Sequence, residues 1–255
     1  TSPGLSAQVD WKESVRMISR HGEVFIINLF LYVLGYSRMK YLQLTVDRKQ
    51  KTVFECLHQA FLYTGGVPEE IWFDNMKTVV DRGRSQFTRV AFNETFNYFS
   101  KDAGFKPIAC RPFRPQTKGK VEALARTMNR LQVFNHEFTD LDDLEQLVKE
   151  LNYDLNFEEL SQGTFKRPVD RWSLEKENLK RVNLDHLQSY YEETPESRKV
   201  SKEAMVIYNY QKYSVPISYI GKTVTFIVDD GILRIYDGET MIRAHPLSKK
   251  PLNYH

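Results

Sequence analysis

An eleven-residue apolar run, VFIINLFLYVL at 24–34, constrains the fold of this chain more than any other feature of its sequence. The run is too short for a transmembrane helix, which needs about 20 apolar residues, and Asn28 interrupts it. Polar segments flank the run on both sides, which is typical of a strand that is buried on both faces. Such a strand requires a sheet with packed layers on either side.

Two segments next to this run predict neighbouring strands. Residues 7–14, AQVDWKES, alternate polar side chains such as Asp10 with apolar ones such as Trp11, as half-buried strands do. Residues 39–46, MKYLQLTV, follow the run after a short Gly-containing connection that suits a hairpin. Three antiparallel strands are therefore expected at the start of the domain.

Alternating helices and strands are predicted after residue 46. In the segment 50–66 apolar residues recur at helical spacing, and a Gly-Gly pair supplies the C-terminal stop. The further elements expected are a strand at 69–75, a helix at 93–104, a strand at 105–113 and a helix at 140–155. The polar stretch 81–89 gives no prediction. An antiparallel trio followed by alternating elements indicates an α/β domain, with a mixed sheet covered by helices.

Composition predicts more than one core. The 255 residues are 41% hydrophobic, which suffices for one substantial core and a smaller one. We expect a main domain at 1–156, a linker with short helices at 157–199, where Pro168 and Pro195 interrupt a polar sequence, and a small β-barrel at 200–255. The last region alternates strongly and contains two Asp-Gly pairs, which favour tight turns, so about five strands are expected there.

Charge and motif content narrow the function classes in part. The net charge of +3 permits an acidic partner such as nucleic acid but does not establish one. Cys56 and Cys110 form neither a CxxC pair nor a disulfide framework, which fits a reducing cytosol, and no signal peptide opens the chain. The opening TSPGLS is interpreted as a linker or a cloning remnant. No Gly-rich phosphate loop, GxSxG elbow or metal-ligand histidine spacing occurs.

The segment 111–131, RPFRPQTKGKVEALARTMNRL, surrounds one acid, Glu122, with basic residues. On a helical wheel Glu122 lies at the border between the apolar stripe and the polar face. Taken alone, it is most simply one partner of an i,i+4 ion pair with Arg126, which stabilises a helix by about 0.2–0.5 kcal/mol. The local pattern therefore does not require a function for this carboxylate.

Two further acids change that interpretation. Asp10 lies on the first strand and Asp74 at the end of the fourth, so with Glu122 they converge at one end of the sheet if those two strands are neighbours. Singly, Asp10 is most simply a solvated strand residue and Asp74 a turn former. Together they would repel one another unless a divalent cation neutralises them. Mg²⁺ prefers oxygen ligands and is shared with phosphates, which suits phosphoryl transfer on DNA.

The segments AQVDWKE, IWFDNMKTVV and RPFRPQTKGKVEAL, in this order, resemble the catalytic core of IstA-type insertion-sequence transposases. These belong to the DDE transposase and retroviral integrase superfamily. The resemblance covers most of the chain, including the small β-barrel. It implies an RNase H-like fold, a mixed five-stranded sheet with flanking helices followed by an all-β barrel, and it implies that Asp10, Asp74 and Glu122 are the catalytic triad.

The resemblance also implies a chemistry and partners. Asp10 and Asp74 would bridge two Mg²⁺ ions, which Mn²⁺ can replace, and Glu122 would complete the second site. Metal-dependent cleavage would free a 3′-OH at each transposon end, and this hydroxyl would attack target DNA. The implied partners are double-stranded DNA, further copies of the chain on that DNA, and an AAA+ helper ATPase. A bacterial, nucleoid-associated cytoplasmic protein is expected, with no membrane contact.

Two features depart from the family pattern. Asp74 and Glu122 are 48 positions apart, more than is familiar in integrases, and Lys12 stands where Gly is expected. The basic residues around the triad become expected phosphate contacts, although a solubilising face is the alternative. The residues expected to contact DNA are Lys12, Arg111, Arg114, Lys118, Gly119, Lys120 and Arg126. Two other functions stay open: an RNase H-like nuclease without strand transfer, and a DNA-binding scaffold with structural acids.

Overall fold

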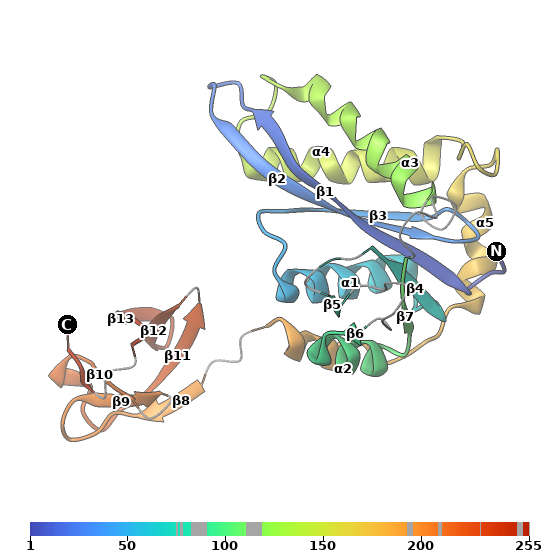
Figure 1. Ribbon diagram of the computed structural model, residues 1–255. Coiled ribbons are helices and arrows are strands. Elements are labelled where there is room, and N and C mark those ends of the chain that lie inside the picture. The colour runs from blue at the N-terminus through green and yellow to red at the C-terminus, as the bar shows by residue number, and fades with distance from the viewer. Residues whose placement is uncertain are drawn as a thin grey trace. The chain divides into compact units, whose positions relative to one another are not determined.

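The structure, a computed structural model, describes residues 1–74, 76, 79–82, 91–110, 119–192, 196–208, 211–229, 231–248 and 252–254. The chain forms two compact units, Thr1–Tyr191 and Glu192–His255 (Figure 1).

The first unit is built on a five-stranded mixed sheet with the order β3-β2-β1-β4-β7 (Figure 1). Strands β1, β2 and β3 pair antiparallel, whereas β4 pairs parallel to β1, and β7 pairs parallel to β4. The bounds are β1 Ser6–Ile18, β2 Val24–Leu34, β3 Lys40–Thr45, β4 Glu70–Phe73 and β7 Lys106–Ala109. The predicted RNase H-like α/β sheet is confirmed, and the first and fourth strands are neighbours.

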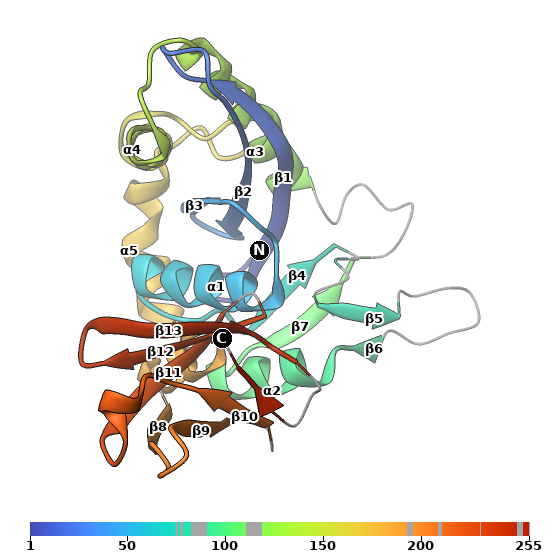
Figure 2. The same cartoon turned by 90° about the vertical axis from the view of Figure 1, so that its left-hand side faces the viewer.

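Helices cover both faces of this sheet (Figures 1 and 2). Helices α1 (Gln50–Thr64) and α2 (Glu94–Ala103) lie on one face, and α3 (Gly119–Thr127) and α4 (Leu141–Tyr153) lie on the other. A short 3-10 helix, Met128–Phe134, continues α3. The short strands β5 (Val80–Arg82) and β6 (Ala91–Phe92) form a separate pair between β4 and α2.

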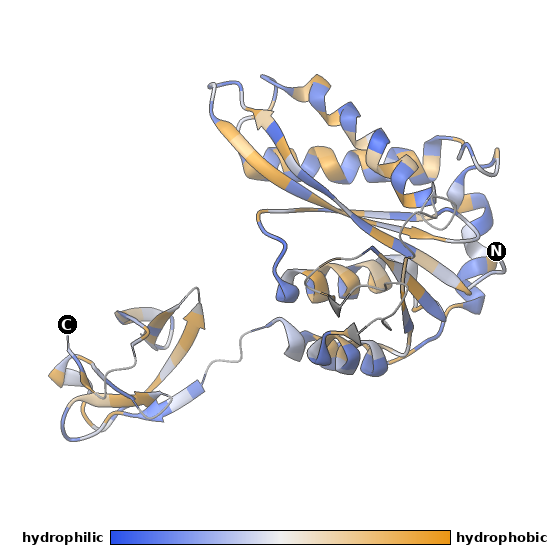
Figure 3. Cartoon of the chain, in the orientation of Figure 1, coloured by the Kyte–Doolittle hydropathy of each residue, from blue (hydrophilic) through white to orange (hydrophobic). Residues whose placement is uncertain are grey.

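Strand alternation divides the apolar side chains between two cores. On β1, Val9 and Trp11 face α1 and α2 and pack in a cluster with Phe54 and Phe61. The second cluster joins β2 to α3 and α4, where residues such as Leu31 and Val121 pack together. Residues 27–34 of β2 are all buried, so the apolar run is covered on both faces from Ile27 onward, whereas Val24 and Ile26 at its start are exposed. The strand is the most continuously hydrophobic element in Figure 3.

Helix α1 ends where its sequence predicts. Gly65 takes a left-handed conformation with φ +83°, and its N–H donates to the carbonyl of Phe61 at 2.9 Å. A side chain at this φ would be strained, which explains the stop by glycine. Helix α2 begins after Asn93, whose side chain accepts the N–H groups of Thr95 and Phe96, and ends at Gly104.

The segment 157–191 belongs to the first unit, which differs from the predicted linker. It contains helix α5 (Pro168–Asn178), and both Leu179 and Leu187 are buried in the core beside α1 and α2. Glu175 is fully buried and accepts the N–H groups of Tyr36 and Ser37 at 3.2 and 2.7 Å. The segment is polar overall, but the buried side chains of Leu179, Leu187 and Glu175 pack it against the first unit.

The second unit is all-β. Within its described residues, seven strands form a three-stranded sheet of order β14-β10-β9 and a four-stranded sheet of order β13-β12-β11-β8. The strands are β8 Glu196–Lys199, β9 Met205–Tyr208, β10 Gln211–Ser214, β11 Thr223–Asp229, β12 Ile232–Asp237, β13 Thr240–Pro246 and β14 Leu252–Asn253. The sequence predicted about five, so it underestimated the number of short strands. Residues such as Tyr213 and Phe226 form its core.

In the part of the chain that the structure describes, no helix has both the length and the apolar character needed to cross a membrane.

Candidate active site

Asp10 and Asp74 occupy equivalent positions on neighbouring parallel strands. Val9 of β1 pairs with Phe73 of β4, and each aspartate is the residue that follows. Neighbouring strands lie about 4.7–4.9 Å apart, so the two aspartates project from adjacent points of the sheet. The sequence left this adjacency conditional on strand order, and the sheet order meets the condition.

The face of the sheet follows from alternation. Val9 and Phe73 are both fully buried in the cluster under α1 and α2. Since successive side chains of a strand point to opposite faces, the position of Asp10 on β1 belongs to the opposite face, which α3 covers, and Asp74 is the first residue after β4. Both aspartates are half-buried.

Gln8 attaches helix α3 to this face. Its Oε1 accepts the N–H of Val121 at 3.2 Å, and its side chain is buried. Val121 is the third residue of α3, and N–H groups in a first helical turn have no partner within the helix. Gln8 therefore caps α3 from the strand position two residues before Asp10. Glu122, the next residue of the helix, is held close to β1 in consequence.

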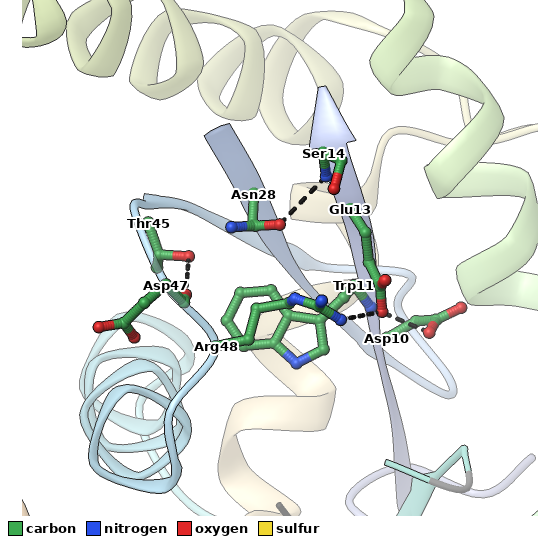
Figure 4. A network of polar contacts seen from close by, with 8 residues as sticks. All are labelled: Asp10, Trp11, Glu13, Ser14, Asn28, Thr45, Asp47 and Arg48. Carbon is green, nitrogen blue, oxygen red and sulfur yellow. Dashed lines mark hydrogen bonds and ion pairs between the residues drawn. The ribbon is translucent and has the colours of Figure 1, made fainter. Parts of the chain in front are cut away.

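A polar network surrounds the strand around Asp10 (Figure 4). The Oδ1 of Asp10 accepts the N–H of Trp11 at 2.9 Å. Beyond Lys12 the pairing of β1 with β2 shifts, and there the Oδ1 of Asn28 accepts the N–H of Ser14 at 3.1 Å. This hydrogen bond holds the bulge in place and so fixes the register of β1 against β2 at Lys12, the residue before the bulge.

A second contact in Figure 4 joins β1 to the start of α1. Glu13 forms an ion pair with Arg48 in the connection between β3 and α1. The side chains of both residues are about half exposed, so the pair contributes about 0–1 kcal/mol to the free energy of unfolding. Its main effect is to position the segment before α1 against β1.

Glu122 is half-buried on α3, between the buried residues Val121 and Leu124 and the exposed Arg126. Among the described residues, Glu122 and Arg126 form no ion pair, so the local interpretation of this carboxylate does not apply in this structure. The three acids thus come from the middle of β1, the residue after β4, and helix α3.

The donor chemistry of these acids fits a hard divalent cation, because all three supply carboxylate oxygen. Nevertheless, within the described residues no three His, Cys, Asp or Glu side chains lie together in a group that could hold a metal ion. The backbone relationship between Asp10 and Asp74 is formed, whereas a three-carboxylate cluster is not assembled.

The predicted DNA contacts divide into two sets. Arg111, Arg114 and Lys118 lie outside the described residues. The described ones are Lys12 and Lys120, both half-buried, with Gly119 and Arg126, both exposed. The Nζ of Lys120 donates to the hydroxyl of Thr1 at 3.3 Å, and a Cβ added to Gly119 would meet nothing within 4 Å.

Sequence reasoning missed two kinds of residue around the site. Gln8 lies two residues before Asp10 and therefore on the same face of β1, so a search for polar residues on that face would have found it. Asn28 was recognised only as an interruption of an apolar run, although it fixes the bulge. Arg38 and Lys40 line a cavity beside α3, and nothing in their local sequence indicates that.

The sheet order defines an RNase H-like α/β unit, which is followed in the chain by an all-β unit. The chain is 36% identical over its whole length to the transposase for insertion sequence element IS232 of Bacillus thuringiensis subsp. berliner. It is 30% identical, over 97% of its length, to the transposase for IS21 of Pseudomonas aeruginosa. Along its whole length the chain is therefore similar in sequence to insertion-sequence transposases. It spans 58% and 62% of the length of these two relatives.

Two further comparisons concern parts of the chain. Residues 188–251 match the family model for the Mu transposase, C-terminal domain, which corresponds closely to the all-β unit. Among solved structures, the catalytic core domain of BIV integrase superposes with a TM-score of 0.48 at 16% identity, covering 68% of this chain and 97% of that one.

Proposed function

We propose that this chain is the catalytic part of a DNA transposase, which cleaves transposon ends and joins the resulting 3′-OH to target DNA. The observation that carries the proposal is the register of β1 and β4, which sets Asp10 and Asp74 side by side. The attachment of α3 through Gln8 supports Glu122 as the third member. Similarity to insertion-sequence transposases supports DNA as the substrate.

Asp10, Asp74 and Glu122 would hold Mg²⁺, or Mn²⁺ in its place. When bound, such ions polarise phosphoryl oxygens and lower the pKa of bound water. The protein supplies three carboxylates on fixed elements, and the attachment of α3 to β1 limits how far Glu122 can move from the pair. Lys12 and Lys120 flank these acids in the sequence and supply positive charge for DNA phosphates.

The partners are part of the same proposal. The chain would act on double-stranded DNA in more than one copy, and the family resemblance implies an AAA+ helper ATPase. None of the described residues is assigned to the helper contact. As functional domains we propose a catalytic domain that includes 157–191, followed by the all-β unit.

A strand-transfer assay tests this function. The chain, joined to the part of the IS232 transposase that it does not span, is incubated with Mg²⁺, pre-cleaved end duplexes and a plasmid target. Joined products support the transposase. Hydrolysis without joining would point to a nuclease.

Variants of the aspartates separate catalysis from scaffolding. Asp10→Asn and Asp74→Asn should lower cleavage and joining roughly a thousandfold or more, since metal ions supply several kcal/mol of transition-state stabilisation. DNA binding should be retained. Asp142→Asn, an exposed acid in the first turn of α4, is the matched control. A DNA-binding scaffold with structural acids is favoured if Asp10→Asn and Asp74→Asn both process DNA like the wild type and the control, and the unassembled carboxylate cluster is the observation behind that alternative.

A further inference from the structure

A cavity of about 410 Å³ lies in the first unit beside helix α3. Its walls come from three places: the exposed flank of α3 and the 3-10 helix after it, the turn between β2 and β3, and residues 155–163. Volumes of this order are typical of sites for small molecules.

Basic side chains dominate the charge of this cavity. Its lining contains Arg38, Lys40, Lys120 and Arg130, and Glu159 is its acid. The Nη1 of Arg130 contacts the carboxylate of Glu159 at 2.7 Å, which neutralises one of the four cations. Three cations thus remain around the cavity, a surplus that favours an anionic occupant.

Arg38 lines the cavity and is held in place by the residues around it. Its Nη1 atom is buried and has no hydrogen-bond partner, although a buried unsatisfied donor destabilises a fold. The residue has φ +68° in the β2–β3 turn, whose preceding N–H groups are bound by the buried carboxylate of Glu175. A Cβ added to Gly163 would lie 3.6 Å from Arg38 Nε, so the turn at 161–163 lies against the guanidinium.

Lys40 adds a second constrained cation. Its Nζ donates to the carbonyls of Arg38 and Leu155 at 3.1 and 3.2 Å, and these contacts leave its charge uncompensated by an acid in direct contact. Burial lowers the pKa of Lys40 to about 8, the nearby Glu159 opposes that shift, and Arg38 adds to it. An anion in the cavity would offset the repulsion between the two basic side chains.

The cavity is separate from the candidate active site. It contacts Ala123 and Thr127 of α3. At about 100° per residue these positions lie roughly 100° and 140° around the helix from Glu122. An occupant of the cavity would therefore sit on a different flank of α3 from the catalytic acids.

We propose that this cavity is a binding site for a phosphate group, contacted by Arg38 and the basic residues around it. Within the proposed function, on which this part rests, the phosphate belongs to the backbone of bound DNA, and the site fixes a strand to the helix that carries Glu122. The volume leaves room for the sugar attached to that phosphate. A free phosphate or nucleotide shares the same chemistry.

The test uses the 255-residue chain with Arg38→Gln, which removes the charge and keeps a polar side chain. Ala123→Leu fills the cavity from α3 without changing charge and covers the case in which the Arg38 variant folds poorly. Lys149→Gln, on the exposed face of α4, is the matched loss of one positive charge elsewhere. The probes are inorganic phosphate, compared with chloride at equal ionic strength in thermal unfolding, and a labelled mixed-sequence duplex titrated at several salt concentrations.

Phosphate should raise the unfolding midpoint of the wild type and of Lys149→Gln, and both cavity variants should bind it roughly tenfold more weakly or worse. With DNA as the source, Arg38→Gln also lowers the slope of log affinity against log salt by about 0.9, the value for one phosphate contact. If Arg38→Gln loses the stabilisation by inorganic phosphate but keeps the wild-type salt dependence of DNA binding, the cavity is a phosphate site that does not bind the DNA backbone.

The proposal is overturned if neither probe distinguishes the cavity variants from Lys149→Gln. These binding measurements are made without catalysis. Failure of the active-site assignment would therefore appear separately, as unchanged DNA processing by Asp10→Asn.

Discussion

Asp10 and Asp74 follow directly on Val9 and Phe73, which pair with each other on two neighbouring parallel strands. The relationship requires β4 to lie beside β1 although Asp10 and Asp74 are 64 positions apart in the chain, and the crossover through β2, β3 and α1 provides it. Under the proposed function, the two neighbouring acids would bind the same metal ion.

Glu122→Gln should abolish DNA cleavage and joining without unfolding α3. The side chain is half-buried and forms no ion pair with Arg126, so the neutral amide costs the helix little, within about 0.5 kcal/mol. Circular dichroism and thermal unfolding report on the fold, and the strand-transfer assay reports on activity. Arg126→Gln is the control on the same helix and should weaken DNA binding while leaving chemistry in place. Comparable activity of Glu122→Gln and wild type would remove Glu122 from the site.

Gln8→Leu should lower both stability and activity. The substitution keeps the volume but leaves the buried N–H of Val121 without its acceptor, which costs about 1–3 kcal/mol. Because this bond holds α3 against β1, cleavage should fall even below the unfolding temperature. Chemical denaturation measures the free energy of unfolding. Asn129→Leu, at an exposed position after α3, serves as the control. A variant with wild-type stability would show that the bond does not hold the helix.

The segment 157–191 should be required for the first unit to fold. Leu187 is fully buried in the core beside α1, and Leu187→Ala should cost about 2–5 kcal/mol. A chain that ends at Tyr191 should unfold cooperatively, whereas one that ends at residue 156 should not. The exposed Leu174→Ala is a control for the loss of a leucine in this segment. Cooperative unfolding of the shorter chain at the same midpoint would restore the interpretation of this segment as a linker.

Lys40 should make stability rise with pH in alkaline solution. Burial lowers its pKa to about 8, below the ordinary value of 10.5, so between these values the unfolded chain binds more protons than the folded one. Folding is most favourable above pH 10.5, where Lys40 is neutral in both the folded and the unfolded chain. This gain in stability is lost as the pH falls through 8, where Lys40 becomes charged in the folded protein. Unfolding free energies of the wild type minus those of Lys40→Met should therefore increase across this window by on the order of 3 kcal/mol.

The difference between the two proteins cancels the titration of tyrosines, which both contain. A flat difference from pH 7.5 to 10.5 would show that Lys40 is not held in a low-polarity environment. Lys149→Met, at an exposed ion-paired lysine, should show no such slope.

Much of the fold was predictable because its signals are local. The alternation around Asp10, the apolar run at 24–34 and the glycine stop at Gly65 each specify an element within a few residues. The sequence also identified the candidate acids. It could not establish that Asp10 and Asp74 are adjacent, because strand order is set by packing between distant segments.

The errors concern residues whose role depends on distant partners. Leu179, Leu187 and Glu175 are sparse in a polar segment, so hydrophobic pattern alone predicted a linker where they are buried. In the second unit several strands are only two to four residues long, too short to show alternation clearly. The cavity beside α3 combines Arg38 with Arg130, which lie 92 positions apart, and no local motif could indicate it.

A crystal structure of the chain soaked with Mn²⁺, read by its anomalous signal, tests the central claim most directly. The account predicts a peak between the carboxylates of Asp10 and Asp74, with Glu122 turned toward it, and no such peak in Asp10→Asn. A metal bound elsewhere, or three carboxylates that stay apart in saturating Mn²⁺, would contradict the assignment of these residues as a metal-dependent active site.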